Sequence, residues 1–302
     1  MAADKKNPYL YFEPSKMDRL TNLSFTVRQA VEGFISGLHR SPHKGFSVEF
    51  AEHREYSPGD DLRHLDWLAW ARSDRYYIKQ YEQETNLRAH ILLDVSASMN
   101  YKHDAKITKF QYGCFLASCL TYLMCRQQDS VGMIAFDKDV RFHIPPASSP
   151  SHMDRIFTQL EGLTPGGKTA VGDTFHNLAN RIAKRGLVII ISDLYDDQSE
   201  ILKALQHFVY KKHQIIVFHV MDQAELDFPF TKVSSFVDME TKQKIQVDPR
   251  YVKQGYIDEM NAFIDRYRLE CSSHKIEYVL ASTSNPYERM LLDYLARRKK
   301  LR

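Results

Sequence analysis

The chain has 302 residues, of which 43% are hydrophobic and 26% are charged. Both fractions lie near the average for globular domains, which excludes a disordered, collagen-like or disulfide-scaffold protein. The 41 Lys and Arg against 38 Asp and Glu leave a formal charge of +3, too small to argue for nucleic acid or membrane as a partner.

Targeting and redox signals are also absent from the sequence. The opening Met-Ala-Ala-Asp-Lys-Lys is not followed by the apolar core of a signal peptide, and no apolar run reaches the length of a membrane helix. The four cysteines lack the two-residue spacing of zinc or redox motifs. We therefore expect a cytoplasmic protein with reduced, buried thiols.

Residues 1–85 are predicted to form an N-terminal extension. Apolar residues at 20–38 suit a short helix that ends near Gly37. Residues 46–81 are rich in aromatic and charged side chains around a Pro-Gly-Asp-Asp turn signal at 58–61. This composition indicates short strands and loops, not a helix bundle.

After residue 86, apolar runs of strand length alternate with segments of helical periodicity. The predicted strands are residues 88–94, 130–136, 141–144, 187–192, 214–220 and 275–281. The predicted helices are residues 106–126, 151–160, 171–184, 199–211, 251–273 and 286–298. Such alternation predicts an α/β domain over residues 86–302, with a doubly wound, mainly parallel sheet covered on both faces. Strand-like runs at 233–237 and 244–247 predict a β-hairpin insertion at about 225–250.

Polar residues follow two of the predicted central strands at their carboxyl ends. Asp94, Ser96 and Ser98 come after the strand at 88–94, and Asp193 follows the strand at 187–192. Such strand ends line the ligand crevice of a doubly wound sheet. A carboxylate and two hydroxyls from one loop are hard oxygen donors, which suit Mg²⁺ or Mn²⁺.

A further hydroxyl is expected from the loop that contains a Pro-Gly-Gly turn at 165–167. Thr169 follows this turn, and Thr164, five residues earlier, is the alternative donor. A Ser-rich turn after a strand is more often a helix cap than a metal site. The conjunction of two Asp-ended central strands with two hydroxyl-bearing loops favours the metal site.

The run Asp94-x-Ser96-x-Ser98, followed by Thr169 and Asp193, resembles the metal-ion-dependent adhesion site of von Willebrand factor A domains. Residues 49–67, EFAEHREYSPGDDLRHLDW, resemble the signature of a bacterial family with that fold, domain-of-unknown-function family fifty-eight. The resemblance covers about residues 45–286, with the signature region at 45–85. It implies that the first-loop residues, Thr169 of the second loop and Asp193 of the third would hold the metal.

The resemblance also implies a partner. Members of this family are commonly linked to AAA+ ATPases of the MoxR type, as accessory or adaptor proteins, so the partner is expected to be such an ATPase or its client. Few direct carboxylates leave a bound cation electrophilic, and an open coordination position can then accept an Asp or Glu from another protein. The sequence thus predicts a non-enzymatic, metal-dependent protein-binding module.

Two enzymatic interpretations compete with this one. The run from Gly162 to Thr169 satisfies the phosphate-loop pattern G-x-x-x-x-G-K-[ST], and Asp193 could serve as the magnesium-binding Asp of a nucleotide hydrolase. A true phosphate loop follows a buried strand, whereas the residues before Gly162 have helical spacing. A phosphotransferase with Asp94 as nucleophile would need a second carboxylate two residues on, where Ser96 stands.

Trp67 and Trp70, near Arg63, Arg72 and Arg75, form an aromatic and basic segment. Such a segment could stack on nucleic acid bases. Apolar residues in alternation more often fill a core, so we expect the two Trp to pack against the sheet. An exposed pair of Trp would instead be a candidate partner-binding anchor.

Overall fold

The computed structural model describes residues 9–12, 48–57, 65–73, 75–83, 87–167 and 171–300. The chain divides into two compact units. Among the described residues, one unit holds 9–12 and those from 87 onward, and the other holds those from 48 to 83. The predicted N-terminal extension is therefore shared between the units, and its expected helix at 20–38 lies outside the described residues.

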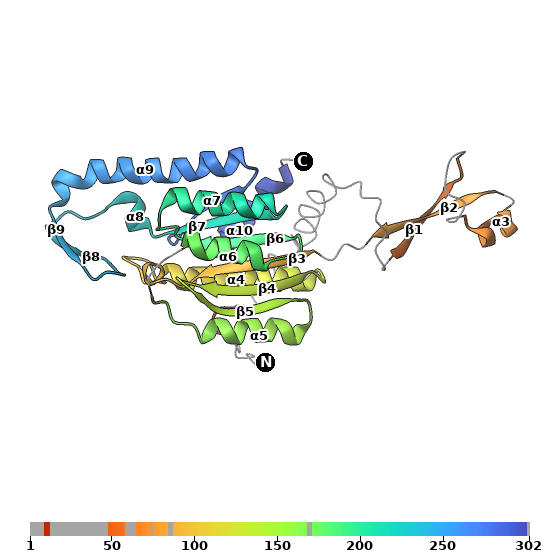
Figure 1. Cartoon of the computed structure of the whole chain (residues 1–302), viewed down its shortest axis with the longest axis horizontal. Coiled ribbons are helices and arrows are strands. Elements are labelled where there is room, and N and C mark those ends of the chain that lie inside the picture. Colours follow the sequence, from red (N-terminus) through yellow and green to blue (C-terminus); the bar gives the residue numbers. More distant parts are fainter. Residues whose placement is uncertain are drawn as a thin grey trace, which may run out of the picture. The chain divides into compact units, whose positions relative to one another are not determined.

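The larger unit is built on a six-stranded sheet with the order β10-β7-β6-β3-β4-β5 (Figure 1). The strands are β3 (Arg88–Asp94), β4 (Ser130–Phe136), β5 (Val140–Ala147), β6 (Leu187–Ser192), β7 (Gln214–Met221) and β10 (Glu277–Ser282). All neighbours pair in parallel except β5, which is antiparallel to β4. Strands β3 and β6 are buried along almost their whole length, as continuous Ile, Leu and Val runs require. The predicted α/β class with a mainly parallel sheet is confirmed.

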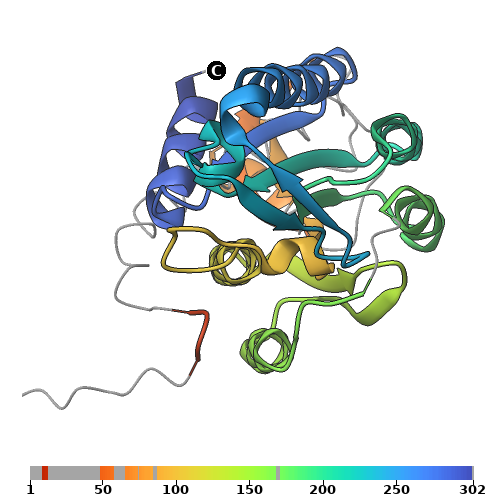
Figure 2. The ribbon, with the colours of Figure 1, turned by 90° about the vertical axis from the view of Figure 1, so that its left-hand side faces the viewer.

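Helices cover both faces of this sheet (Figure 2). They are α4 (Lys109–Arg126), α5 (Pro150–Glu161), α6 (Val171–Arg181), α7 (Gln198–Tyr210), α9 (Pro249–Ser273) and α10 (Tyr287–Lys300). Figure 2 shows α6, α7 and α9 on one face and α4, α5 and α10 on the other. On the first face, Ile190 of β6 belongs to a buried cluster with Phe208 of α7 and Tyr267 of α9. On the second, Gly113 lets α4 approach the sheet, because a Cβ there would lie 3.0 Å from the Leu93 side chain.

Capping interactions fix where the site-bearing helices begin. The Thr108 hydroxyl accepts a hydrogen bond from the Gln111 amide at 3.1 Å, and the Gln111 side chain accepts one from the Thr108 amide at 3.0 Å. This capping box starts α4 at Lys109, three residues later than the sequence pattern indicated. A short helix that was not predicted, α8 (Gln223–Asp227), begins with a second capping box, formed by Asp222 and Glu225.

The predicted hairpin is present as β8 (Ser234–Val237) paired with β9 (Lys244–Val247) in antiparallel fashion. Within the described ranges, no helix combines the length and the apolar composition that crossing a membrane requires.

The smaller unit pairs β1 (Val48–Glu55) with β2 (Tyr77–Gln83), and α3 (Trp67–Ser73) lies between them in the chain. The expectation that both Trp are packed in a core is wrong, because Trp67 is 61% exposed and Trp70 is 37% exposed. Their spacing of three residues is helical and places them on neighbouring turns of α3. Trp70 stacks on Tyr76 with ring centroids 6.0 Å apart and meets Trp67 edge-on at 6.3 Å.

Candidate functional site

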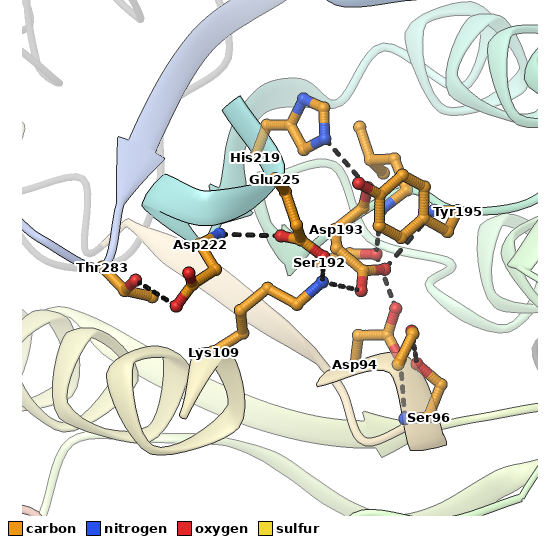
Figure 3. A network of polar contacts seen from close by, with 12 residues as sticks. Asp94, Ser96, Lys109, Ser192, Asp193, Tyr195, His219, Asp222, Glu225 and Thr283 are labelled. Carbon is orange, nitrogen blue, oxygen red and sulfur yellow. Dashed lines mark hydrogen bonds and ion pairs between the residues drawn. The ribbon is translucent and has the colours of Figure 1, made fainter. Parts of the chain in front are cut away.

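The carboxyl ends of β3 and β6 bring the two predicted Asp residues to one edge of the sheet. The strands are parallel neighbours, with Leu93 opposite Ile191, so the residues that follow them leave the sheet side by side. The Ser192 hydroxyl, at the end of β6, donates a hydrogen bond of 2.6 Å to Asp94 Oδ2 (Figure 3). Asp94 and Asp193 are both fully buried.

The first loop turns back on itself directly after Asp94. The Ser96 amide donates to Asp94 Oδ1 at 2.9 Å, and the Ser96 and Ser98 hydroxyl oxygens lie 3.0 Å apart. A short 3-10 turn, η2 (Ala97–Asn100), follows and keeps the loop tight. The three oxygen donors predicted from the first loop are thus gathered in one place.

The second loop is tied directly to the first. The Gly166 amide donates to the Val95 carbonyl at 2.8 Å, and the Gly167 carbonyl accepts from the Ala97 amide at 3.3 Å. Gly167 has a φ of +87°, and a Cβ there would lie 2.5 Å from Asp137 Oδ2, so both the backbone and the space demand glycine. Thr169 lies outside the described residues, and the choice between Thr169 and Thr164 stays a prediction.

The phosphate-loop pattern stands in a different context from that of a nucleotide hydrolase. Helix α5 ends at Glu161, and Gly162 is its C-cap, so the stretch follows a helix as the sequence spacing indicated. The Gly166 amide, which a phosphate loop would direct at its ligand, is bonded to Val95.

Sequence reasoning missed a buried lysine at this edge. Lys109 is the first residue of α4 and its side chain has no exposed surface. Its Nζ lies 2.8 Å from Asp193 Oδ2 and 2.7 Å from Glu225 Oε1 (Figure 3). One signal was available, because a lysine in the first turn of a helix opposes the helix dipole and needs a compensating anion.

The ion pair continues into a polar network around the carboxyl ends of β7 and β10. Glu225 Oε2 accepts from the Asp222 amide at 2.7 Å, and the Thr283 hydroxyl donates to Asp222 Oδ2 at 3.0 Å. His219 of β7 has its Nε2 2.8 Å from the backbone carbonyl of Asp193. These contacts hold α8 and the loop after β6 in fixed positions beside the two buried Asp residues.

Burial dominates the electrostatics of the site. It raises the pKa of Asp94 to about 7, and the charge of Asp193 adds to this shift, while hydrogen bonds from Ser192 and Ser96 oppose it. Burial alone would lower the pKa of Lys109, but the carboxylates of Asp193 and Glu225 outweigh it and raise that pKa to about 12. Burial likewise raises the pKa of Glu225, against the opposing effect of Lys109.

The donor set fits a hard divalent cation. In the part of the chain that the structure describes, no three His, Cys, Asp or Glu side chains gather as a metal cluster. Asp94, Ser96 and Ser98 provide hard oxygen donors, and Asp193 provides a second carboxylate. Among the described residues, the Ser96 amide and the Ser192 hydroxyl donate hydrogen bonds to Asp94, and both of these donors are neutral.

Comparison with known proteins places the chain in a family. Protein Rv1480 of Mycobacterium tuberculosis (strain ATCC 25618 / H37Rv) is 23% identical over 222 residues, which cover 72% of this chain and 68% of that protein. The crystal structure of BatB from Bacteroides thetaiotaomicron aligns with a TM-score of 0.45 at 21% identity, over 71% of this chain and 99% of that one. The SpRpn10 VWA domain aligns with a TM-score of 0.38 at 15% identity, over 69% of this chain and 95% of that one. The family model described as "Protein of unknown function DUF58" matches residues 52–262, and the chain belongs to that family.

Proposed function

We propose that the protein is a cytoplasmic, non-enzymatic protein-binding module whose binding depends on Mg²⁺ or Mn²⁺ at the carboxyl edge of its sheet. The observation that carries this proposal is the buried Asp94 carboxylate, which lies beside two paired hydroxyls and a second buried Asp. A buried charge without a counter-ion is costly, and a cation at this place would remove the cost. The resemblance adds Thr169 as the ligand from the second loop.

The chemistry of this donor set suits capture better than catalysis. Ser96 and Ser98 are neutral ligands, and the charge of Asp193 is already paired with Lys109. A divalent cation bound here keeps much of its charge and attracts a carboxylate from outside. The proposed ligand is therefore an Asp or Glu on the surface of a partner protein.

The proposed partner is a MoxR-type AAA+ ATPase or its client, which the resemblance to the family nominates. The protein would then act as an accessory or adaptor protein. Trp67 and Trp70 offer a second, independent contact, because exposed aromatic side chains that pack against each other are frequent anchors of protein interfaces.

A pull-down with the immobilised full chain tests the proposal. A purified MoxR-type ATPase from the same organism is expected to be retained in Mg²⁺ and lost in EDTA. Asp94→Ala should lose it in both buffers, while the control Asp104→Ala, which removes a carboxylate that is 93% exposed, should behave as wild type. Equal retention in both buffers by wild type and by Asp94→Ala would show that the metal site is not the docking surface.

A further inference from the structure

Two carboxylates, those of Asp193 and Glu225, share the ammonium of Lys109 next to Asp94 of the candidate metal site. The side chains of Lys109 and Asp193 are 0% exposed, and that of Glu225 is 12% exposed. Lys109 Nζ lies between the two carboxylates, 2.8 Å from Asp193 and 2.7 Å from Glu225. The residues that carry metal-ligand chemistry therefore share their edge of the sheet with a built-in cation (Figure 3).

The ammonium is held in place from several directions. Tyr195 presents its ring 4.8 Å from Lys109 Nζ, and Tyr101 presents its ring at 5.8 Å. Glu225 is itself fixed, because its other carboxylate oxygen accepts from the Asp222 amide in the capping box of α8. A charge that is fixed in a water-poor place acts strongly on a second charge nearby.

The contacts of Asp193 show how the positive charge of Lys109 affects cation binding at the site. Asp193 Oδ2 accepts from Lys109, and Oδ1 lies 3.4 Å from the Tyr195 amide, so both oxygens already face donors. The Lys109 charge therefore cancels much of the attraction that Asp193 would exert on a divalent cation. Glu225 acts in the opposite sense, since its negative charge offsets that of Lys109.

We propose that Lys109 and Glu225 are positioning residues that set the affinity of the site for its cation: Lys109 weakens cation binding, and Glu225 restores part of it. The inference rests on the proposed metal-dependent function. It makes the two members of one ion pair act in opposite directions on metal affinity, although the loss of either should weaken the fold.

The test is a titration with Mn²⁺ alone, followed by its paramagnetic signal, on the full chain and its variants. Lys109→Met keeps the side-chain volume and removes the charge, and it should tighten Mn²⁺ binding on the order of tenfold. Glu225→Gln keeps an oxygen for the Asp222 amide, and it should weaken binding on the order of tenfold. Lys106→Met, a change at an exposed lysine in the loop before α4, is the matched control and should leave the affinity unchanged.

Thermal unfolding of the same variants separates this role from a purely structural one. Both variants should lower Tm, because Lys109→Met leaves the carboxylates of Asp193 and Glu225 without their cation, and Glu225→Gln leaves Lys109 with one carboxylate instead of two. If both variants shift Mn²⁺ affinity in the same direction, or neither shifts it while wild type binds, the inference is wrong. Should Lys109→Met fail to fold, Glu225→Gln decides alone, since unchanged or tighter binding in that variant contradicts the proposal. If wild type binds no Mn²⁺, the proposed function itself fails, which is a different result from either of these.

Discussion

Asp94 couples the metal site to pH. Its pKa in the folded protein is raised to about 7 from the usual 3.8, so between these values the native state holds a proton that the unfolded chain has released. The contribution of Asp94 to the free energy of unfolding therefore falls as pH rises through this window. A cation needs the carboxylate form, so cation binding below about pH 7 must displace this proton.

We predict that Mn²⁺ affinity falls roughly tenfold for each pH unit below about pH 7, and levels off above it. Calorimetric titrations at several pH values, in buffers of different ionisation enthalpy, measure both the affinity and the number of protons released. Close to one released proton is expected well below pH 7. An affinity that is the same at about pH 6 and about pH 8 would contradict the role given to Asp94.

The sequence predicts the positions of some residues of the site but not of others. Asp94 and Asp193 could be predicted as neighbours because each ends an apolar strand of a parallel sheet, and parallel strands end at one edge. Lys109 could not be paired in advance, because its partners are 84 and 116 residues away in the chain. Only the packing of α4 and α8 against the same strand ends brings these charges together.

At the scale of elements, the second loop requires glycine at position 167 but not at position 166, directly before it. Gly167→Ala places a Cβ where Asp137 Oδ2 lies 2.5 Å away and forces a residue with a side chain to a φ of +87°. We predict a loss of roughly 1–3 kcal/mol in the free energy of unfolding and weaker Mn²⁺ binding, since this loop is bonded to the first one.

Gly166→Ala is the matched control, because a Cβ at Gly166 would have nothing within 4 Å and its φ is not positive. Urea unfolding of both variants measures the difference. Equal stability of Gly167→Ala and Gly166→Ala would show that the loop is not held as described.

The run from Gly162 to Thr169, which matches the phosphate-loop pattern, leads to a second prediction about a single structural element. It follows helix α5 and not a strand, and its Gly166 amide is bonded to the Val95 carbonyl, so this amide is not free to bind a phosphate. We predict no ATP binding at micromolar concentration by the isolated protein, and no effect of Lys168→Ala. Nucleotide binding by wild type that disappears in Lys168→Ala would promote the nucleotide hydrolase instead.

The elements differ in how well their sequences predicted them. The bounds of β3, β4 and β6 match the prediction at both ends, because these strands are continuous apolar runs between polar residues. The five-residue helix α8 was missed, since it is too short to show a helical period, although Asp222 and Glu225 carry a capping-box pattern. Helix α3 was missed because its aromatic residues were interpreted as strand alternation.

At the scale of the whole molecule, Trp67 and Trp70 on α3 are exposed and are candidates for a second surface that contacts the partner protein. Trp67 is 61% exposed, so its side chain contributes little to the packing of its own unit. We predict that Trp67→Ala changes the free energy of unfolding by less than about 0.5 kcal/mol but reduces retention of the ATPase in Mg²⁺. Leu10→Ala, at a residue that is 64% exposed in the larger unit, is the control. Unchanged retention by Trp67→Ala would remove the aromatic pair from the docking surface.

The central claim is that Asp94 and its neighbouring hydroxyls hold a divalent cation. A Mn²⁺ titration of wild type, Asp94→Ala and Asp104→Ala tests this most directly, with circular dichroism to show that all three are folded. We expect one Mn²⁺ site in wild type and in Asp104→Ala. We expect no Mn²⁺ site in Asp94→Ala, because this substitution removes the carboxylate of the first loop. Equal Mn²⁺ affinity in wild type and folded Asp94→Ala would contradict the account.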